Sequence, residues 1–517
     1  METWLLHRHA STGALLLLCG LPLLLAGLAL LSRDIVLSDQ FASDVLLNLS
    51  GAWHLNSGHR QHVDFHAAVG SLNFLMSLAG FQIVGFKASA FLVGQMLMAL
   101  LLSAMAVMVV GRRLPLGPSV VFVLYVTLLA MMPTNVGNYP DSFTFAAAYN
   151  RHGWSAISIL CLILFAPPRP SKAGDMVDIA CGLLLLLAMF YLDIAYCLAG
   201  ICALVLALWI SGHARARWWA WAAVGLLVLA NAATAYGHAY LTDIQGAFVS
   251  QPDRMGVKRL LVAGVLGNAT ELSIHGAGLI TAIWLWRQGR VTMALPLTTL
   301  FLIVAAILLF AQTMQLRGLP LGAVIPFLLY GALLPFRGPS GWVVPVLLLA
   351  MPAVTALTAM YTIADYVITT PRSERLLISR VNDTRDLAMP LPSDMPASPL
   401  ERATYFSSLL EAASLFSPAR YPSGRIVVID RINPLPFILG FPPPRGGDLF
   451  WDRGSPPRPA EEILGDADYV LVPTKSFSSP RLTRVASERF TPYLTAHFPI
   501  REEADSWILY ARVAPRG

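Results

Sequence analysis

The chain has 517 residues, of which 56% are hydrophobic and only 13% are charged, and its mean hydropathy is +0.62. Soluble domains carry about 25% charged residues, so this composition excludes an ordinary soluble protein and indicates a polytopic membrane protein. The net charge of +6 does not indicate nucleic-acid binding, because Arg and Lys fall mainly in short loops between apolar segments, as membrane orientation requires. All five cysteines lie in apolar segments, which excludes a disulfide framework in the hydrophilic part.

Apolar segments predict about 11 transmembrane helices. They cover residues 12–32, 89–110, 117–133, 153–166, 177–192, 195–211, 218–238, 270–286, 291–311, 319–335 and 342–362. Several are shorter than the roughly 20 residues that span a bilayer, so we expect tilted helices or half-helices among them. The first apolar run is too long for a signal peptide and lacks a small-residue cleavage site, which indicates an uncleaved helix.

The charges of the connecting segments predict an orientation. Tight turns on one side carry the basic residues Arg8, Arg112, Arg113, Arg169, Lys172, Arg215, Arg217, Arg287, Arg290 and Arg337. The positive-inside rule assigns this side to the cytoplasm. The longer loops 33–88 (the first loop), 134–152 (the second loop) and 239–269 then lie outside, with everything after residue 363. The prediction is a multi-pass plasma (inner) membrane protein with a cytoplasmic N-terminus.

A composition change beyond Tyr361 predicts a second domain. Residues 1–366 form the transmembrane domain, and residues 367–517 form a small extracytoplasmic α/β domain. Its strands are expected at 425–430, 468–473 and 507–513, and its helices at 400–416, 458–465 and 482–495. No Walker-type or GxGxxG phosphate loop is present, so ATP-driven transport has no support.

The first loop contains a predicted amphipathic helix. Ser43 is a suitable N-cap and Gly58 a suitable stop, which predicts a helix over 44–56. We expect its apolar face to lie on the membrane surface. Asp44 then occupies the first turn, with Asn48 one turn along on the same face. A carboxylate there can accept a proton from a hydroxyl group, although an ordinary helix-starting acid fits the same pattern.

This loop resembles the GT-C superfamily of polyprenyl-phosphate-sugar-dependent glycosyltransferases, especially the bacterial members. Asp44, Ala52-Trp53, Gly58 and Asp64-Phe65 follow the order and approximate spacing of the motifs in that family. The likeness covers about residues 10–210, including the basic turn at Arg112 and Arg113. Two departures are that Asp44-Val45 replaces the usual Asp-Glu pair, and that Asp39 competes for the leading acidic position.

The resemblance implies a GT-C-like fold and an inverting sugar transfer. The donor would be a polyprenyl-phosphate sugar, and the acceptor a glycan, lipid or protein of the cell envelope at the outer face of the membrane. Asp44 would be the general base, and Asp64 would bind substrate. The alternative for Asp64 is a loop anchor, which an Asp-Phe pair also provides.

The second loop carries one acid and one strong cation. By the resemblance Asp141 is the second catalytic carboxylate. Arg151 suits a phosphate, because its planar fork donates paired hydrogen bonds to oxygen. Tyr149, Asn150 and His152 flank it and complete the predicted substrate-binding set. A turn residue after Pro140 and an interfacial anchor beside Trp154 are the structural alternatives for Asp141 and Arg151.

Four histidines surround Asp64, namely His54, His59, His62 and His66. Their spacing matches no established zinc pattern, so no metal ligands are assigned, although some members of the family use a divalent ion. Two other functions remain open. One is a transporter or flippase for a lipid-linked intermediate, and the other is a non-catalytic membrane scaffold whose external domain binds a partner.

Overall fold

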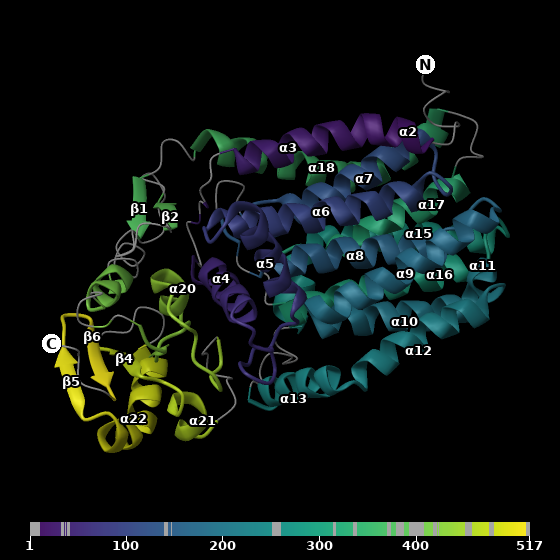
Figure 1. The fold of residues 1–517 in the computed structure, drawn as a ribbon. Coiled ribbons are helices and arrows are strands. Elements are labelled where there is room, and N and C mark those ends of the chain that lie inside the picture. The colour runs from purple at the N-terminus through teal and green to yellow at the C-terminus, as the bar shows by residue number, and fades with distance from the viewer. Residues whose placement is uncertain are drawn as a thin grey trace.

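The computed structural model describes residues 11–32, 36, 38, 42–138, 143–145, 147–250, 260–313, 317–333, 339–369, 374–378, 387–391, 408–416, 421, 423–449, 458–474 and 480–512. Most of the described chain is helical. The helices run side by side as an elongated bundle, and a smaller C-terminal unit, residues 408–512, lies at one end of it (Figure 1).

Helices account for the whole N-terminal part. In chain order they are α2 (Thr12–Leu15), η1 (Leu16–Gly20), α3 (Leu21–Leu31), α4 (Ala42–Asn56), α5 (Leu72–Val84), α6 (Ser89–Val110), α7 (Leu116–Met131), α8 (Ala148–Phe165), α9 (Lys172–Leu192), α10 (Ile194–Ile210), α11 (Gly212–Arg215), α12 (Trp218–Ala232), α13 (Ala235–Ser250), η3 (Leu260–Val265), η4 (Leu266–Asn268), α15 (Ala269–Arg287), α16 (Ala294–Thr313), η5 (Pro320–Val324), α17 (Ile325–Leu333) and α18 (Pro339–Thr369). Each apolar segment predicted from the sequence coincides with one or more of these helices.

Fewer helices than predicted have the length and composition of membrane spans. Within the described ranges these are Thr12–Leu31, Ser89–Val110, Lys172–Leu192, Ala294–Gln312 and Leu349–Ile368. The pair α12 and α13, bent by 74°, counts as a sixth if it forms one broken span. Exposed leucines on the first helix, including Leu17 (68% exposed) and Leu25 (57%), fit contact with lipid. The structure therefore supports a helical membrane protein with five or six spans, and not eleven.

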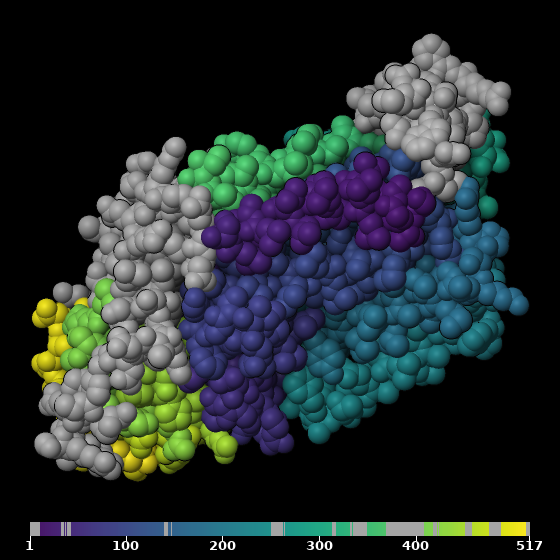
Figure 2. Space-filling view, turned by 45° about the horizontal axis from the view of Figure 1, so that its top comes forward, coloured from purple at the N-terminus to yellow at the C-terminus, as the bar shows by residue number. Residues whose placement is uncertain are grey.

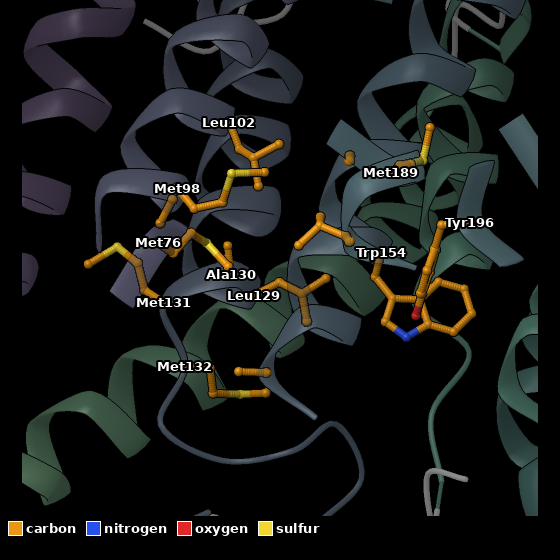
Figure 3. Close-up of a cluster of buried hydrophobic side chains, with 14 of the residues drawn as sticks. Met76, Met98, Leu102, Leu129, Ala130, Met131, Met132, Trp154, Met189 and Tyr196 are labelled. Carbon is orange, nitrogen blue, oxygen red and sulfur yellow. The ribbon is translucent and has the colours of Figure 1, made fainter. Parts of the chain in front are cut away.

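The centre of the bundle is packed with large, soft side chains (Figure 3). Met76 of α5, Met98 of α6 and Met131 of α7 are all less than a tenth exposed. Thioethers fill irregular gaps between helices well. Trp154 of α8 meets Tyr196 of α10 edge-on, with ring centroids 5.4 Å apart. This packing fixes the position of α8, which is important for the site described below.

The C-terminal unit contains a four-stranded sheet in the order β3-β4-β6-β5. Its strands are β3 (Ile426–Val428), β4 (Tyr469–Pro473), β5 (Ile500–Glu503) and β6 (Trp507–Ala511), with helices α20 (Leu435–Leu439), α21 (Ala460–Leu464) and α22 (Pro480–His497). β3 and β4 pair in parallel, and the other pairs are antiparallel. Three of these strands fall where the sequence predicts them, whereas β5 and α20 were not predicted. A separate antiparallel pair joins β1 (Glu374–Ile378) and β2 (Leu387–Leu391).

The first loop lies between the helical bundle and the C-terminal unit (Figures 1 and 2). α4 packs on α5 and on α20. We call the end of the bundle that carries α4, α13 and this unit the docked end, and the end that carries Arg112, Arg113 and Arg217 the basic end. The first described helix, α2, lies toward the basic end, and the last described strand, β6, lies at the docked end (Figure 1).

Candidate functional site

The first loop forms the predicted helix, but its apolar face is covered by protein. α4 spans Ala42–Asn56, close to the expected 44–56, but Ser43 lies inside the helix and is therefore not its N-cap. Leu46 and Leu49 are completely buried, and the Trp53 indole N–H donates to the Phe441 carbonyl of the C-terminal unit at 2.8 Å. The prediction that this face lies on the membrane surface is therefore wrong, because α5 and α6 of the bundle and α20 of the C-terminal unit pack on α4 instead.

Asp44 lies in the first turn of α4 and reaches the start of α8. Its Oδ2 accepts the backbone N–H of Ala147 at 3.1 Å. Ala147 is the residue before α8 and has a left-handed backbone, with φ 46°, which is uncommon for a residue with a β-carbon. The positive end of the α8 dipole also favours a negative charge there. Packing thus brings the leading acid of the first loop to the end of the second loop.

The surroundings of Asp44 act on its pKa in opposite directions. Burial raises the pKa of Asp44, and the charge of Arg431, the Ala147 N–H and the Ser43 side chain oppose that rise. The net pKa lies above the usual value for aspartate, and a carboxylate with a raised pKa is a better proton acceptor near neutral pH. Arg431 belongs to the C-terminal unit, and no sequence pattern predicts that its charge acts on this acid.

Two of the predicted substrate-binding residues have structural partners. The Asn48 side-chain amide donates to the backbone carbonyl of Asp44 at 2.7 Å. Asp64 closes a turn by accepting the Arg60 backbone N–H at 2.8 Å. Burial would raise the pKa of Asp64, but this N–H and the charges of Arg445, His59 and Arg60 lower it overall. Asp64 matches the loop-anchor alternative more closely than a substrate ligand.

The remaining predicted residues begin α8. Tyr149 is partly buried, whereas Asn150, Arg151 and His152 are almost fully buried. Arg151 Nη1 donates to the Asn135 side-chain oxygen at 2.9 Å and to the Thr134 carbonyl at 3.3 Å. Asp141 lies outside the described residues.

Arg151 lies in a buried polar region whose hydrogen-bonding capacity is only partly used. Arg151 is only 1% exposed, and its Nε has no hydrogen-bond partner within the described chain. Among the same residues no carboxylate forms an ion pair with it. The Thr134 hydroxyl and the Gln95 side-chain oxygen are also buried without a partner there. Unsatisfied buried groups are rare, and a bound, oxygen-rich ligand would satisfy the guanidinium.

Asp44 and Arg151 therefore share one helix end. Ala147, whose N–H binds Asp44, precedes Arg151 by four residues, which is about 6 Å along a helix axis. The structure thus joins an acid from the first loop and a buried cation from the second loop at the docked end. The sequence predicted both residues, but it predicted neither Arg431 nor the Ala147 N–H.

The histidines of the first loop belong to a different cluster. His62 and His66 both contact Asp243 of α13, with Nδ1–O distances of 2.8 and 2.9 Å. His54 and His59 contact each other through their Nδ1 atoms at 3.2 Å. In the part of the chain that the structure describes, no group of three or more His, Cys, Asp or Glu is arranged to hold a metal ion.

Arg112 and Arg113 at the basic end both form ion pairs with carboxylates. Arg113 binds Asp178 with two nitrogens, at 2.9 and 2.7 Å, and also donates to the carbonyls of Val109, Ile163 and Ala166. Arg112 bridges Asp178 and Asp175. These residues hold α6, α8 and α9 together, so their role here is structural.

No family model, curated protein or solved structure matches this chain. The resemblance to the GT-C superfamily therefore rests on the motifs of the first two loops.

Proposed function

We propose that this protein is an integral membrane glycosyltransferase of GT-C type that uses a polyprenyl-phosphate sugar as donor. The observation that carries the proposal is that Asp44 and the buried Arg151 both lie at the start of α8. A glycosyl transfer from a phosphate needs a base for the acceptor hydroxyl and a cation for the departing phosphate. The five or six apolar spans provide a setting for a lipid-linked donor.

In the proposed reaction the acceptor oxygen attacks the anomeric carbon of the sugar. The new C–O bond forms as the bond from that carbon to the phosphate oxygen breaks, and its electron pair leaves with the polyprenyl phosphate. Asp44 takes the proton of the acceptor hydroxyl. Arg151 balances the charge that develops on the phosphate. Inversion at the sugar carbon follows from direct displacement, as the resemblance implies, and Asp141 would position one of the substrates.

The proposal includes the location of the site. The docked end would face the outer side of the plasma membrane, and the basic end would face the cytoplasm. The acceptor would be a glycan, lipid or protein of the cell envelope. Tyr149, Asn150 and His152 of α8 surround Arg151 and would contact the donor.

The test is sugar transfer in vesicles that contain the purified full chain and radiolabelled polyprenyl-phosphate hexoses or pentoses. We expect Asp44→Asn to lower transfer by about 10²–10⁴-fold, the usual contribution of a positioned base. Asp64→Asn removes the loop-anchoring carboxylate and is the matched control, with a much smaller expected loss. Full transfer by a folded Asp44→Asn variant would refute the role of Asp44. Movement of the lipid across the membrane without transfer would favour the flippase.

A further inference from the structure

One arginine at the contact between the C-terminal unit and the bundle has three carboxylate partners. Arg458, just before α21, donates from Nη2 to Asp243 of α13 at 2.8 Å. Its Nη1 binds Glu462 at 3.0 Å, and its Nε binds Asp448 at 3.3 Å. All three guanidinium nitrogens are thus engaged. Asp448 and Glu462 belong to the C-terminal unit, so the bond to Asp243 is the one by which Arg458 reaches the bundle.

Asp243 is also the point where the first loop meets this contact. A carboxylate only accepts hydrogen bonds, so the Nδ1 atoms of His62 and His66 donate to it, at 2.8 and 2.9 Å. Tyr236 and Tyr240 of α13 pack against the His62 ring, and Glu462 lies 3.9 Å from His66 Nε2. Three segments far apart in the sequence therefore converge on one carboxylate.

Arg458 and its partners Asp243 and Asp448 are shielded from water, so the two carboxylates depend on the arginine to balance their charge. The side chains of Asp243 and Asp448 are 8% and 7% exposed, and that of Arg458 is 16% exposed. Removing Arg458, the one arginine that the described residues bring to Asp243 and Asp448, takes the cation from two buried carboxylates, which strongly disfavours the docked arrangement. A neighbouring ion pair between the same two parts, Arg445 with Asp64 at 3.8 Å, has an arginine side chain that is 62% exposed and is expected to contribute little.

The same docking places Arg431 near Asp44. Arg431 precedes α20 by four residues, and α20 packs on α4, whose first turn holds Asp44. Phe437 of α20 stacks on Phe81 of α5, with ring centroids 5.4 Å apart. The backbone of His66 pairs with Gly447 and Leu449 in the following loop. A shift of the C-terminal unit would therefore move Arg431 relative to Asp44.

We infer that Arg458 is a positioning residue, which through its contact with Asp243 holds the C-terminal unit so that Arg431 acts on Asp44. The consequence for catalysis rests on the proposed function, but the placement of Arg431 does not. The C-terminal unit thus has a role in the site itself, as the source of a positive charge that acts on the base.

The first measurement is a titration of Asp44 that needs no activity. The carboxyl infrared band that disappears in Asp44→Asn reports the protonation of Asp44 in the full chain. We expect Arg431→Met to move its midpoint up by about one unit, as loss of a neighbouring cation does. Arg458→Met should move it in the same direction, and the double variant should move it no further than Arg431→Met alone. Arg445→Met is the control and should leave it in place.

Two results would overturn the inference. One is an unchanged Asp44 midpoint in Arg458→Met, and the other is a double variant whose shift is the sum of the two single shifts. If Arg458→Met does not fold, Asp243→Asn keeps the test possible, because it removes the charge that Arg458 binds on the bundle and leaves Arg458 with Asp448 and Glu462. Asp243→Asn should move the midpoint of Asp44 in the same direction as Arg431→Met, and an unchanged midpoint would count against the positioning role of Arg458.

A distance measurement tests the docking itself. Spin labels at Gln245→Cys on α13 and Thr495→Cys on α22, two exposed positions, in a Cys202→Ser background, should give one narrow distance in the parent chain. Arg458→Met should broaden it, and Arg445→Met should not. An unchanged distribution in Arg458→Met overturns the inference. If docking and titration respond as expected but Asp44→Asn transfers sugar at the full rate, the proposed function fails and the positioning role of Arg458 stands.

Discussion

The two ends of the bundle each bury an arginine but use it differently. At the basic end Arg113 has a fully buried side chain, a bidentate carboxylate partner and three backbone carbonyls. At the docked end Arg151 is equally buried, yet among the described residues its acceptors are the neutral oxygens of Thr134 and Asn135, and its Nε has none. A buried arginine that is paired with a carboxylate, such as Arg113, has a structural role. A buried arginine without such a partner in the described chain, such as Arg151, is where the proposed function expects a ligand to bind. The following predictions test this difference.

The largest expected effect is on stability at the basic end. Arg113→Met leaves Asp178 buried and deprived of its bidentate partner, which should lower the free energy of unfolding by about 3–5 kcal/mol. Thermal unfolding of the detergent-solubilised protein measures this loss. Arg113→Met combined with Asp178→Leu should recover part of it, because no carboxylate is then left unpaired. A neutral effect of Arg113→Met would mean that the pair does not hold these helices together.

The corresponding change at the docked end should affect activity and not stability. Arg151→Met removes a buried charge that has no ion-pair partner in the described chain, so the unfolding temperature should stay the same or rise. Sugar transfer should fall by about 10²–10³-fold, the usual loss when one transition-state donor is removed. Arg151→Lys is the informative companion, because it keeps the charge without the fork. If Arg151→Met lowered the unfolding temperature as much as Arg113→Met, the two buried arginines would not differ in role.

A smaller effect concerns pH and the first loop. Burial, with a minor contribution from His59, lowers the pKa of His54 to about 3, while an unfolded histidine titrates near pH 6.5. Above that pH both states are neutral, and below it only the unfolded state takes up the proton. The protein should therefore lose about 2 kcal/mol through His54 between pH 6.5 and pH 5.

The measurement is the difference in unfolding temperature between the parent chain and His54→Phe across this range. Asp448 also titrates in this range, because burial raises its pKa to about 6. Asp448 stabilises the protein less as the pH rises, and it does so equally in both chains, so the difference between them reports His54 alone. His497→Phe, at an exposed position on α22, is the control. If the difference in unfolding temperature between the parent chain and His54→Phe did not change with pH, His54 would be protonated to the same extent in the folded and unfolded states.

The smallest expected effect is at Ala147. Its left-handed backbone costs about 1–2 kcal/mol for a residue with a β-carbon, so Ala147→Gly should raise stability by up to about 1 kcal/mol while keeping the N–H that binds Asp44. Ala148→Gly, one residue into α8, should instead lower stability, because glycine weakens an ordinary helical position. A loss of stability in both variants would argue against strain at Ala147.

The sequence determined the elements whose formation is local. Apolar runs predicted the helices, the alternation after residue 367 predicted β3, β4, β6 and the helices near them, and a cap and a stop predicted α4. It also selected Asp44 and Arg151, because an acid in a first turn and an arginine in a polar loop are visible without a partner. The number of spans was overestimated, since apolarity alone does not separate a buried helix from one that crosses the bilayer.

Tertiary structure decided which of these elements meet. Asp243, Arg458 and His62 lie far apart in the sequence and converge only on folding. α4 carries an apolar face that suits lipid and protein equally, and the neighbouring helices α5 and α20, not the sequence of α4, settle which one covers it. Hydrophobic burial is non-directional, so a pattern predicts that a face is covered but not by what. The positions of Arg431 beside Asp44 and of Arg458 on Asp243 follow from that long-range choice.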